Sequence, residues 1–550
     1  MTRLRPWLAV ALLICQDGPA PSGVAAAGTV ELSTERILAH MRALGDDSME
    51  GRGVGSPGGE RAARYLEARL AELGLEPAVG DGFRQAVPLH GSTPLRDSRL
   101  RVVSAAGVAR ELTLWDDYVL FDTSARTFLP RPVPLTFVAY GIVAPEFDHN
   151  DYQGLEMAGR IAVILTGEPP SDDPFFFDGS APTVYSDPEM KFRTALSRGA
   201  RGAILVPSSR EGVFTDWQRV LDAFRTEDVT LPYGISGNLD LLLNADRAEL
   251  LFDGAEHTFA EVEALDRSGA LRSFPLRVEV GFSGMFRERD FVAHNVAARL
   301  PGSDPLLASE YLLVSAHYDG LGIGLPVGGD AIFNGVIDNA SGTAVVLELA
   351  RVLAAGSPRP RRSILFLFVT GEEKGLLGSR YYRDHPLVPL HRTVAAINVD
   401  GISFLAPTDD FVGVGAELST LGELLQKTLA RLDLRLAEIP EPFRAREPLY
   451  ASDQIAFAQG GVPSILVMEG LSFRGITAAE GLARFVAWGE ERYHSPRDDL
   501  SQPLDRQAIE QHATVLLELV REVANTFTQP QWLPGTPFNG ERLRSLAEGT

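Results

Sequence analysis

The chain has almost no cysteine, since Cys15 is the only one among its 550 residues. It lies in an N-terminal segment where Arg3 and Arg5 precede a short apolar run at 7–14, and three alanines precede Gly28. This order of charge, apolar run and small residues is typical of a cleaved export signal. We therefore expect residues 1–27 to be a signal peptide, the protein to be exported (periplasmic or extracellular), and the mature chain to have no disulfide bond.

Two other interpretations of this N-terminal segment stay open. A segment that is merely disordered would need no cleavage. Lipid attachment at Cys15 is disfavoured, because a lipoprotein signal has a small residue just before the cysteine and this chain has Ile14 there.

Basic residues and long apolar runs are also scarce. The chain has 51 Lys and Arg against 73 Asp and Glu, a net charge of −22, which argues against nucleic-acid binding because that needs a basic surface. After the first 27 residues, no stretch reaches the roughly 18 consecutive apolar residues of a membrane-spanning helix. We expect no stable membrane insertion, and the sequence leaves the oligomeric state open.

A chain of 550 residues is too long for one ordinary hydrophobic core. The type of secondary structure that the sequence predicts also changes along the chain. Residues 33–75 predict two helices, the second capped by Ser56 and ended by Gly74. Short β-rich runs fill residues 95–285, and from about residue 293 strands and helices alternate. This pattern predicts an α/β fold with a mixed, largely parallel sheet flanked by helices, interrupted by a β-rich insert.

Five residues of metal-binding type stand out in the second half of the chain, at strand ends or in nearby loops: His317, Asp338, Glu373, Asp400 and His494. Three of them follow apolar runs at 311–315, 364–369 and 394–397 that read as strands. The carboxyl ends of parallel strands are where α/β sheets bind ligands. Imidazole and carboxylate are ligands that suit zinc.

Each of these residues also has an ordinary structural interpretation. A single histidine at a strand end usually binds nothing, Asp338 could simply cap the helix that follows it, and Asp400 could be a turn residue before Gly401. His494 could be an unliganded loop residue, and Glu373 together with Glu372 could be a solvated acidic turn. It is much less expected that all five ordinary interpretations are true together than that the five residues form one metal centre.

Two carboxylates beside the predicted ligands suggest how such a centre would work. Asp319 lies two residues after His317, so in extended chain it faces the same way and can orient the imidazole. Glu372 and Glu373 follow an apolar strand, where adjacent carboxylates repel unless a cation is present. One of the pair can then bind metal while the other acts as a general base.

These motifs, in this order, resemble those of the di-zinc exopeptidase family. That family includes secreted bacterial leucine-type aminopeptidases and, more distantly, glutamate carboxypeptidase and the transferrin receptor ectodomain. The similarity covers the following segments: 315–320, 338–342, 370–379, 398–401, 452–453 with 461–463, and 493–496. The loop at 49–52 is also similar. Segments 139–146, 150–152 and 199–203 resemble a protease-associated (PA) domain.

The resemblance implies a domain organisation. Residues 28–95 would be the N-terminal part of the peptidase domain, 130–270 the PA insert, 286–528 the catalytic zinc peptidase domain, and 529–550 a C-terminal tail.

The resemblance also implies residue roles and two zinc ions. Asp338 would bridge the ions, His317 and Asp400 would complete one site, and Glu373 and His494 the other. Glu372 would be the general base, Asp319 the residue that orients His317, and Tyr450 an oxyanion donor. One departure is Gln454, which stands where many relatives have histidine, so local substrate contacts are expected to differ.

The implied function is a secreted zinc-dependent aminopeptidase that acts on peptides. A carboxypeptidase or a glutaminyl cyclase of the same fold remains an alternative, although such a cyclase normally lacks the PA insert. A non-catalytic receptor-like protein is the third possibility, but such proteins lose metal ligands, and this chain has all five.

Overall fold

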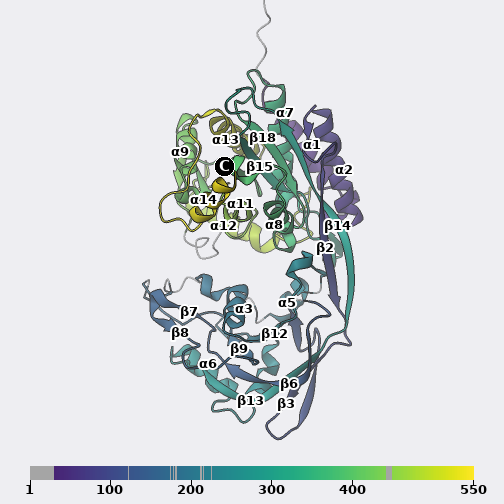
Figure 1. Ribbon diagram of the computed structural model, residues 1–550, viewed down its shortest axis with the longest axis vertical. Coiled ribbons are helices and arrows are strands. Elements are labelled where there is room, and N and C mark those ends of the chain that lie inside the picture. Colours follow the sequence, from purple (N-terminus) through teal and green to yellow (C-terminus); the bar gives the residue numbers. More distant parts are fainter. Residues whose placement is uncertain are drawn as a thin grey trace, which may run out of the picture.

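In a computed structural model, the chain forms two bodies built on separate sheets (Figure 1). The structure describes residues 30–121, 123–173, 175–177, 179, 183–210, 214, 216–224, 226–440 and 449–549. The predicted signal peptide, with Cys15, lies outside these residues. Within the described ranges, no helix combines the length and apolar character needed to cross a membrane.

The elements are bounded as follows. The helices are α1 (Thr34–Leu44), α2 (Pro57–Glu72), α3 (Pro188–Ser197), α5 (Trp217–Phe224), α6 (Phe259–Arg267), α7 (Gly342–Ala355), α8 (Leu377–Asp384), α9 (Leu421–Arg431), α11 (Gln454–Gln459), α12 (Ala478–Glu491), α13 (Arg506–Asn525) and α14 (Asn539–Glu548). The strands are β1 (Glu76–Pro77), β2 (Arg84–Pro94), β3 (Arg99–Val103), β4 (Ala109–Thr113), β5 (Tyr118–Leu120), β6 (Phe128–Phe137), β7 (Val143–Ala144), β8 (His149–Asn150), β9 (Ile161–Leu165), β10 (Gly202–Val206), β11 (Asp228–Thr230), β12 (Leu239–Leu243), β13 (Phe274–Ser283), β14 (Phe286–Leu300), β15 (Tyr311–His317), β16 (Gly322–Val327), β17 (Asp330–Phe333), β18 (Ser363–Val369), β19 (Thr393–Asn398), β20 (Asp410–Val414), β21 (Arg435–Ala437) and β22 (Ser464–Glu469).

The first body is built on a central sheet with the order β11-β2-β14-β18-β15-β19-β22-β20-β21 over the described residues, to which β1 adds at β14. Its middle strands β18, β15, β19 and β22 run parallel, while β14 runs antiparallel to both β18 and β2, and β20 runs antiparallel to β22. The predicted mixed α/β sheet is therefore confirmed. Because the middle strands are parallel, their carboxyl ends meet along one edge.

Both faces of the central sheet are buried, as its apolar strands predict. On β15, Leu312 and Val314 face a core shared with α1, α2, α7, α9 and α13, whereas Leu313 faces Tyr382 of α8 and Phe457 of α11. Successive strand residues point to opposite faces, which accounts for this division.

The second body is an eight-stranded sheet with the order β4-β3-β13-β6-β9-β10-β12-β5 over the described residues, and it has its own apolar core. The sheet extends beyond the predicted 130–270 segment at both ends, because β3 pairs with β13 and these strands bring residues 99–103 against 279–283. A long antiparallel pairing of β2 with β14 joins the bodies and runs along one side of the molecule (Figure 1).

The N-terminal end of the first body forms the predicted helices, whereas the C-terminal end differs from the prediction. The predicted N-terminal helices are confirmed as α1 and α2: Ser56 caps α2 by accepting the Gly59 N–H at 3.1 Å. At the other end, the segment predicted as a tail contains α14. The Arg542 guanidinium donates to the carbonyls of Leu390 and Thr393, so this end packs onto the first body.

Candidate metal centre

Five elements bring the predicted ligands to one edge of the central sheet. His317 is the last residue of β15, and Asp400 lies two residues after β19. Glu373 follows β18 through Gly371, whose φ of 71° suits glycine. Asp338 precedes α7, and His494 follows α12. The parallel arrangement of β15, β18 and β19 therefore gathers side chains that lie far apart in the sequence.

The five side chains form two groups that share one carboxylate. His317 Nε2 lies 3.2 Å from Asp338 Oδ1 and 3.1 Å from Asp400 Oδ1. His494 Nε2 lies 3.1 Å from Asp338 Oδ2 and 3.1 Å from Glu373 Oε2. Within each group, the candidate ligand atoms all lie within 4.8 Å of one another. Asp338 thus contributes one oxygen to each group.

Burial and charge oppose each other strongly at this edge. Burial, reinforced by the carboxylate of Asp400, raises the pKa of Glu372 well above its usual range. Burial alone would lower the pKa of His317, but the carboxylates of Glu372 and Asp400 raise it instead. Burial would raise the pKa of Asp338, yet its hydrogen bonds with both histidines hold it below its usual range. The cluster therefore favours positive charge at its centre.

Asp319 contacts the turn that carries the two glutamates. Its carboxylate accepts the backbone N–H groups of Glu372 at 3.2 Å and of Glu373 at 3.4 Å. Its Oδ1 lies 3.8 Å from His317 Nδ1, too far for a hydrogen bond. Its orienting role toward the imidazole stays a prediction, and its contact with the turn is what the structure adds.

Two residues that the sequence analysis did not single out hold the ligand loops. The fully buried Arg52 guanidinium donates to the carbonyls of Tyr318, Asn334 and Gly335, which flank His317 and precede Asp338. The only sequence signal for it was its place in the 49–52 loop.

The second of these residues is Asp498, four positions after His494. Its carboxylate accepts the backbone N–H groups of Ile337 and Asp338, each at 3.0 Å. It therefore ties the loop of one ligand to the loop of another, and its pKa is raised to about 6 by burial. Its position two residues after the 493–496 motif was a signal that the sequence analysis did not use.

Residues 450–454 fall into an exposed and a buried part. Tyr450 is 49% exposed, and its predicted oxyanion role remains a prediction. Gln454 is fully buried; it accepts from Asn398 Nδ2 at 3.1 Å and donates to the Leu449 carbonyl at 3.0 Å. Gln454, which stands where many relatives have histidine, therefore contacts Asn398, the last residue of β19, two positions before Asp400.

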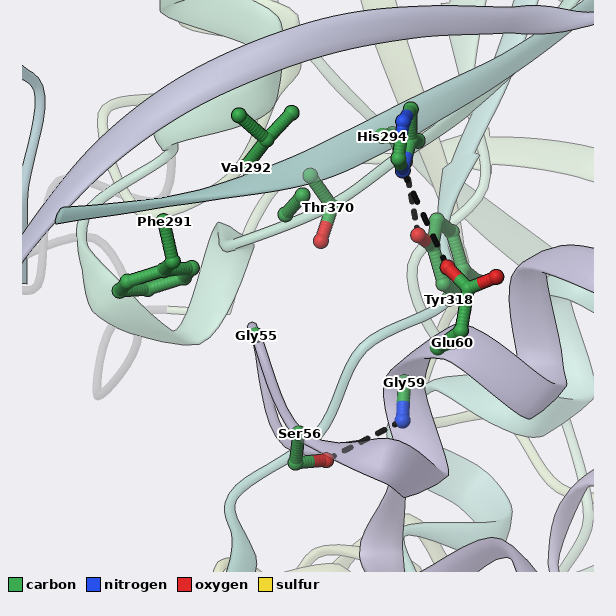
Figure 2. Close-up of a pocket in the computed structure, with 10 residues that line it drawn as sticks. Gly55, Ser56, Gly59, Glu60, Phe291, Val292, His294, Tyr318 and Thr370 are labelled. Atoms are coloured by element: carbon green, nitrogen blue, oxygen red, sulfur yellow. Dashed lines mark hydrogen bonds and ion pairs between the residues drawn. The ribbon is translucent and has the colours of Figure 1, made fainter.

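Two hollows lie near the strand ends. A cavity of about 190 Å³ is bounded by β14 and the start of α2, with Tyr318 and Thr370 on its wall (Figure 2). None of the five predicted ligands lines it. The smaller hollow, of about 10 Å³, opens beside Asp338, Glu373 and His494, with Leu321 and Phe333 as apolar lining.

Comparison with known proteins places this site in a family. Residues 295–520, which contain all five predicted ligands, match the model of Peptidase family M28. We name residues 295–520 the M28 segment. The family resemblance found in the sequence is confirmed, whereas the likeness of the second body to a PA domain stays a prediction.

The alignments with individual relatives cover only part of each relative's length. The chain is 49% identical over 76 residues to mouse (Mus musculus) aminopeptidase NAALADL1, covering 13% of this chain and 10% of that protein. It is 26% identical over 230 residues to aminopeptidase YwaD of Bacillus subtilis, covering 40% and 43%. The chain thus spans less than half the length of these curated relatives.

Among solved structures, the aminopeptidase from Aneurinibacillus sp. strain AM-1 is similar with a TM-score of 0.52 and 18% identity. The match covers 90% of this chain and 95% of that one. At this identity the likeness shows the fold, which extends over both bodies.

Proposed function

We propose that this chain is an exported, zinc-dependent aminopeptidase that binds two zinc ions and releases N-terminal residues from peptides. The observation that carries the proposal is the pair of ligand groups sharing Asp338, with Glu372 beside them, inside the M28 segment. The names of the relatives support the choice of an aminopeptidase.

The residues present fit zinc. Each group offers one imidazole nitrogen and two carboxylate oxygens, which leaves room in a tetrahedral site for water or substrate. His317 is 1% exposed and faces several carboxylates, an arrangement that a bound cation would stabilise. His317, Asp338 and Asp400 would hold one ion, and Asp338, Glu373 and His494 the other.

When bound, zinc supplies Lewis-acid polarisation of a carbonyl and lowers the pKa of a water molecule. The Glu372 carboxylate then accepts the proton of the attacking water and delivers it to the leaving nitrogen. Asp319 supports this step by fixing the backbone of the turn that carries Glu372. The peptide would approach from the side of His494, whose side chain is 42% exposed.

The second body would act as a PA-type domain that restricts which peptides reach the site. Its position inside the peptidase chain and its separate core support this role.

The test is an assay of the purified protein against aminoacyl substrates, N-blocked peptides and peptides with a free carboxyl terminus, with and without chelator. We expect hydrolysis of aminoacyl substrates only, lost with chelator and restored by zinc. Cleavage of N-blocked peptides at the carboxyl terminus would contradict the aminopeptidase assignment.

A further inference from the structure

Lys374 connects the metal-binding turn to the segment that follows α5. It is one of three lysines in the chain and follows Glu373 directly. Its side chain is partly buried, and its ammonium donates to Thr226 Oγ1 at 3.1 Å. Thr226 follows α5 of the second body and is 148 positions away in the sequence. The turn is therefore held by a residue outside the M28 segment.

The segment that contains Thr226 is fixed to the central sheet along its length. We name residues 226–233 the strap. Its strand β11 pairs antiparallel with β2, and Glu227 forms two hydrogen bonds with Arg289 of β14, at 2.8 and 2.6 Å. Tyr233 donates to Asp384 Oδ2, at the end of α8, at 2.8 Å. The strap thus gives Thr226 a defined place relative to the catalytic edge.

The turn is closed by backbone hydrogen bonds from Gly375 and Leu376 to the Glu372 carbonyl, each 2.9 Å long, and side-chain contacts at its two ends add to them. Gly371, with φ of 71°, and Gly375, with φ of 95°, bracket the single turn Glu372–Lys374. The hydrogen bonds from its first two amides to Asp319 are 3.2 and 3.4 Å long. The bond from Lys374 to Thr226 holds the other end, so the two glutamates lie between two anchors.

The position of the Lys374 ammonium also decides whether it forms an ion pair with Glu373, a predicted metal ligand. Over the described residues, no ion pair within 4 Å joins Lys374 to a carboxylate, although Glu373, Glu227 and Asp228 all attract it electrostatically. The ammonium donates to Thr226 Oγ1 at 3.1 Å, while Glu373 Oε2 lies 3.1 Å from His494 Nε2, so the cation and the ligand carboxylate have different partners.

We propose that Thr226 is a positioning residue for the metal-binding turn: through Lys374, the strap keeps Glu372 and Glu373 aligned, so a segment of the chain outside the M28 segment contributes to turnover. This inference rests on the proposed zinc peptidase function and assigns part of its geometry to a residue of the strap.

The test compares Thr226→Val, which removes the acceptor at nearly constant size, with Thr226→Ser, which keeps it. The control is Thr514→Val, the same substitution at a hydroxyl of α13 that donates to the Glu510 carbonyl of the same helix. The measurements are kcat and KM of the zinc-loaded enzyme on an aminoacyl p-nitroanilide, and the rate of zinc loss to a chelator. Loss of a hydrogen bond to a charged group should lower kcat about tenfold with Thr226→Val.

In the same variant, KM should stay within about twofold and zinc loss should be faster, because the bond positions the turn and does not bind substrate. Thr226→Ser and Thr514→Val should resemble the wild type. If Thr226→Val does not fold, Lys374→Met removes the same bond from the other side. Where both fold, the double variant should lose no more activity than either single variant, since one interaction is removed in all three.

Wild-type kinetics and zinc loss in Thr226→Val would overturn this inference while leaving the peptidase function intact. An equal loss in Thr226→Ser would also overturn it, because the hydroxyl would then not be the cause. A wild-type chain that binds no zinc would overturn the proposed function and this inference together.

Discussion

Asp338 is the residue on which the proposed centre depends, because it alone contacts both histidines. Its two oxygens lie 3.2 Å from His317 Nε2 and 3.1 Å from His494 Nε2. Each of the other predicted ligands belongs to one group only. A change at Asp338 should therefore affect both ions, whereas a change at Asp400 or Glu373 should affect one.

We expect Asp338→Asn to lose both zinc ions or to retain one weakly, while the wild type holds two. The reason is that an amide lacks the charge and the second ligand oxygen that bridging requires. Elemental analysis after dialysis measures the stoichiometry, with Asp330→Asn, an exposed position nearby, as the control. A single tightly held ion in the wild type would contradict the two-ion proposal and favour the cyclase alternative.

Glu372 and Glu373 should give opposite phenotypes although they are neighbours. Glu372→Gln should keep the metals and lower turnover by about 10²–10⁴, the usual contribution of general acid–base catalysis. Glu373→Gln should lower metal content, because Glu373 contacts His494 in the second ligand group. Kinetics and elemental analysis on both variants distinguish the roles. Swapped phenotypes would reverse our assignment within the pair.

At the scale of elements, α13 is attached to the central sheet through a buried histidine. His512 Nδ1 accepts the Ser403 N–H at 2.8 Å, and its Nε2 lies 3.2 Å from the Val467 carbonyl of β22. The imidazole therefore carries its proton on Nε2 and is neutral. Burial lowers the pKa of His512 to about 4.

This attachment predicts a pH dependence of stability. A histidine with a lowered native pKa takes up its proton more readily when unfolded, so its contribution is present above pH 6.5 and lost as the pH falls toward 4. Between pH 7 and 5 the loss from His512 should be about 2 kcal/mol. Thermal unfolding of the wild type and His512→Gln at both pH values measures it. Equal pH dependence in the two proteins would contradict the expectation.

At the scale of the whole molecule, the two bodies meet through the β2–β14 pairing and the strap. Pro94 at the end of β2 lies opposite Phe286 at the start of β14. The chain therefore leaves the peptidase body and returns to it at neighbouring points, as inserted domains tend to do. The second body can accordingly be replaced by a short link between these residues.

We expect a chain with residues 95–285 replaced by a short Gly-Ser link to bind both metals and to accept longer peptides than the wild type. Its turnover should fall about as far as in Thr226→Val, because the strap is removed with the second body. Elemental analysis and rates on peptides of increasing length measure both effects. An unchanged length preference in a folded, zinc-loaded deletion would show that the second body serves another purpose.

The sequence by itself determined the middle of the sheet, the first two helices and the identity of the ligand candidates. The reason is that these features are written in local patterns: apolar runs such as 364–369, the cap at Ser56, and acidic or histidine residues directly after strands. Local patterns suffice where an element is long and regular and where a motif is contiguous.

Only the tertiary structure decided which residues support the ligands and hold their loops in place. Arg52 reaches Tyr318 across 266 positions, and Lys374 reaches Thr226 across 148. The extent of the second sheet and the packing of α14 likewise depend on partners far away in the sequence. A buried cation or hydroxyl has no periodicity of its own, and its role is set by the acceptors that folding places around it.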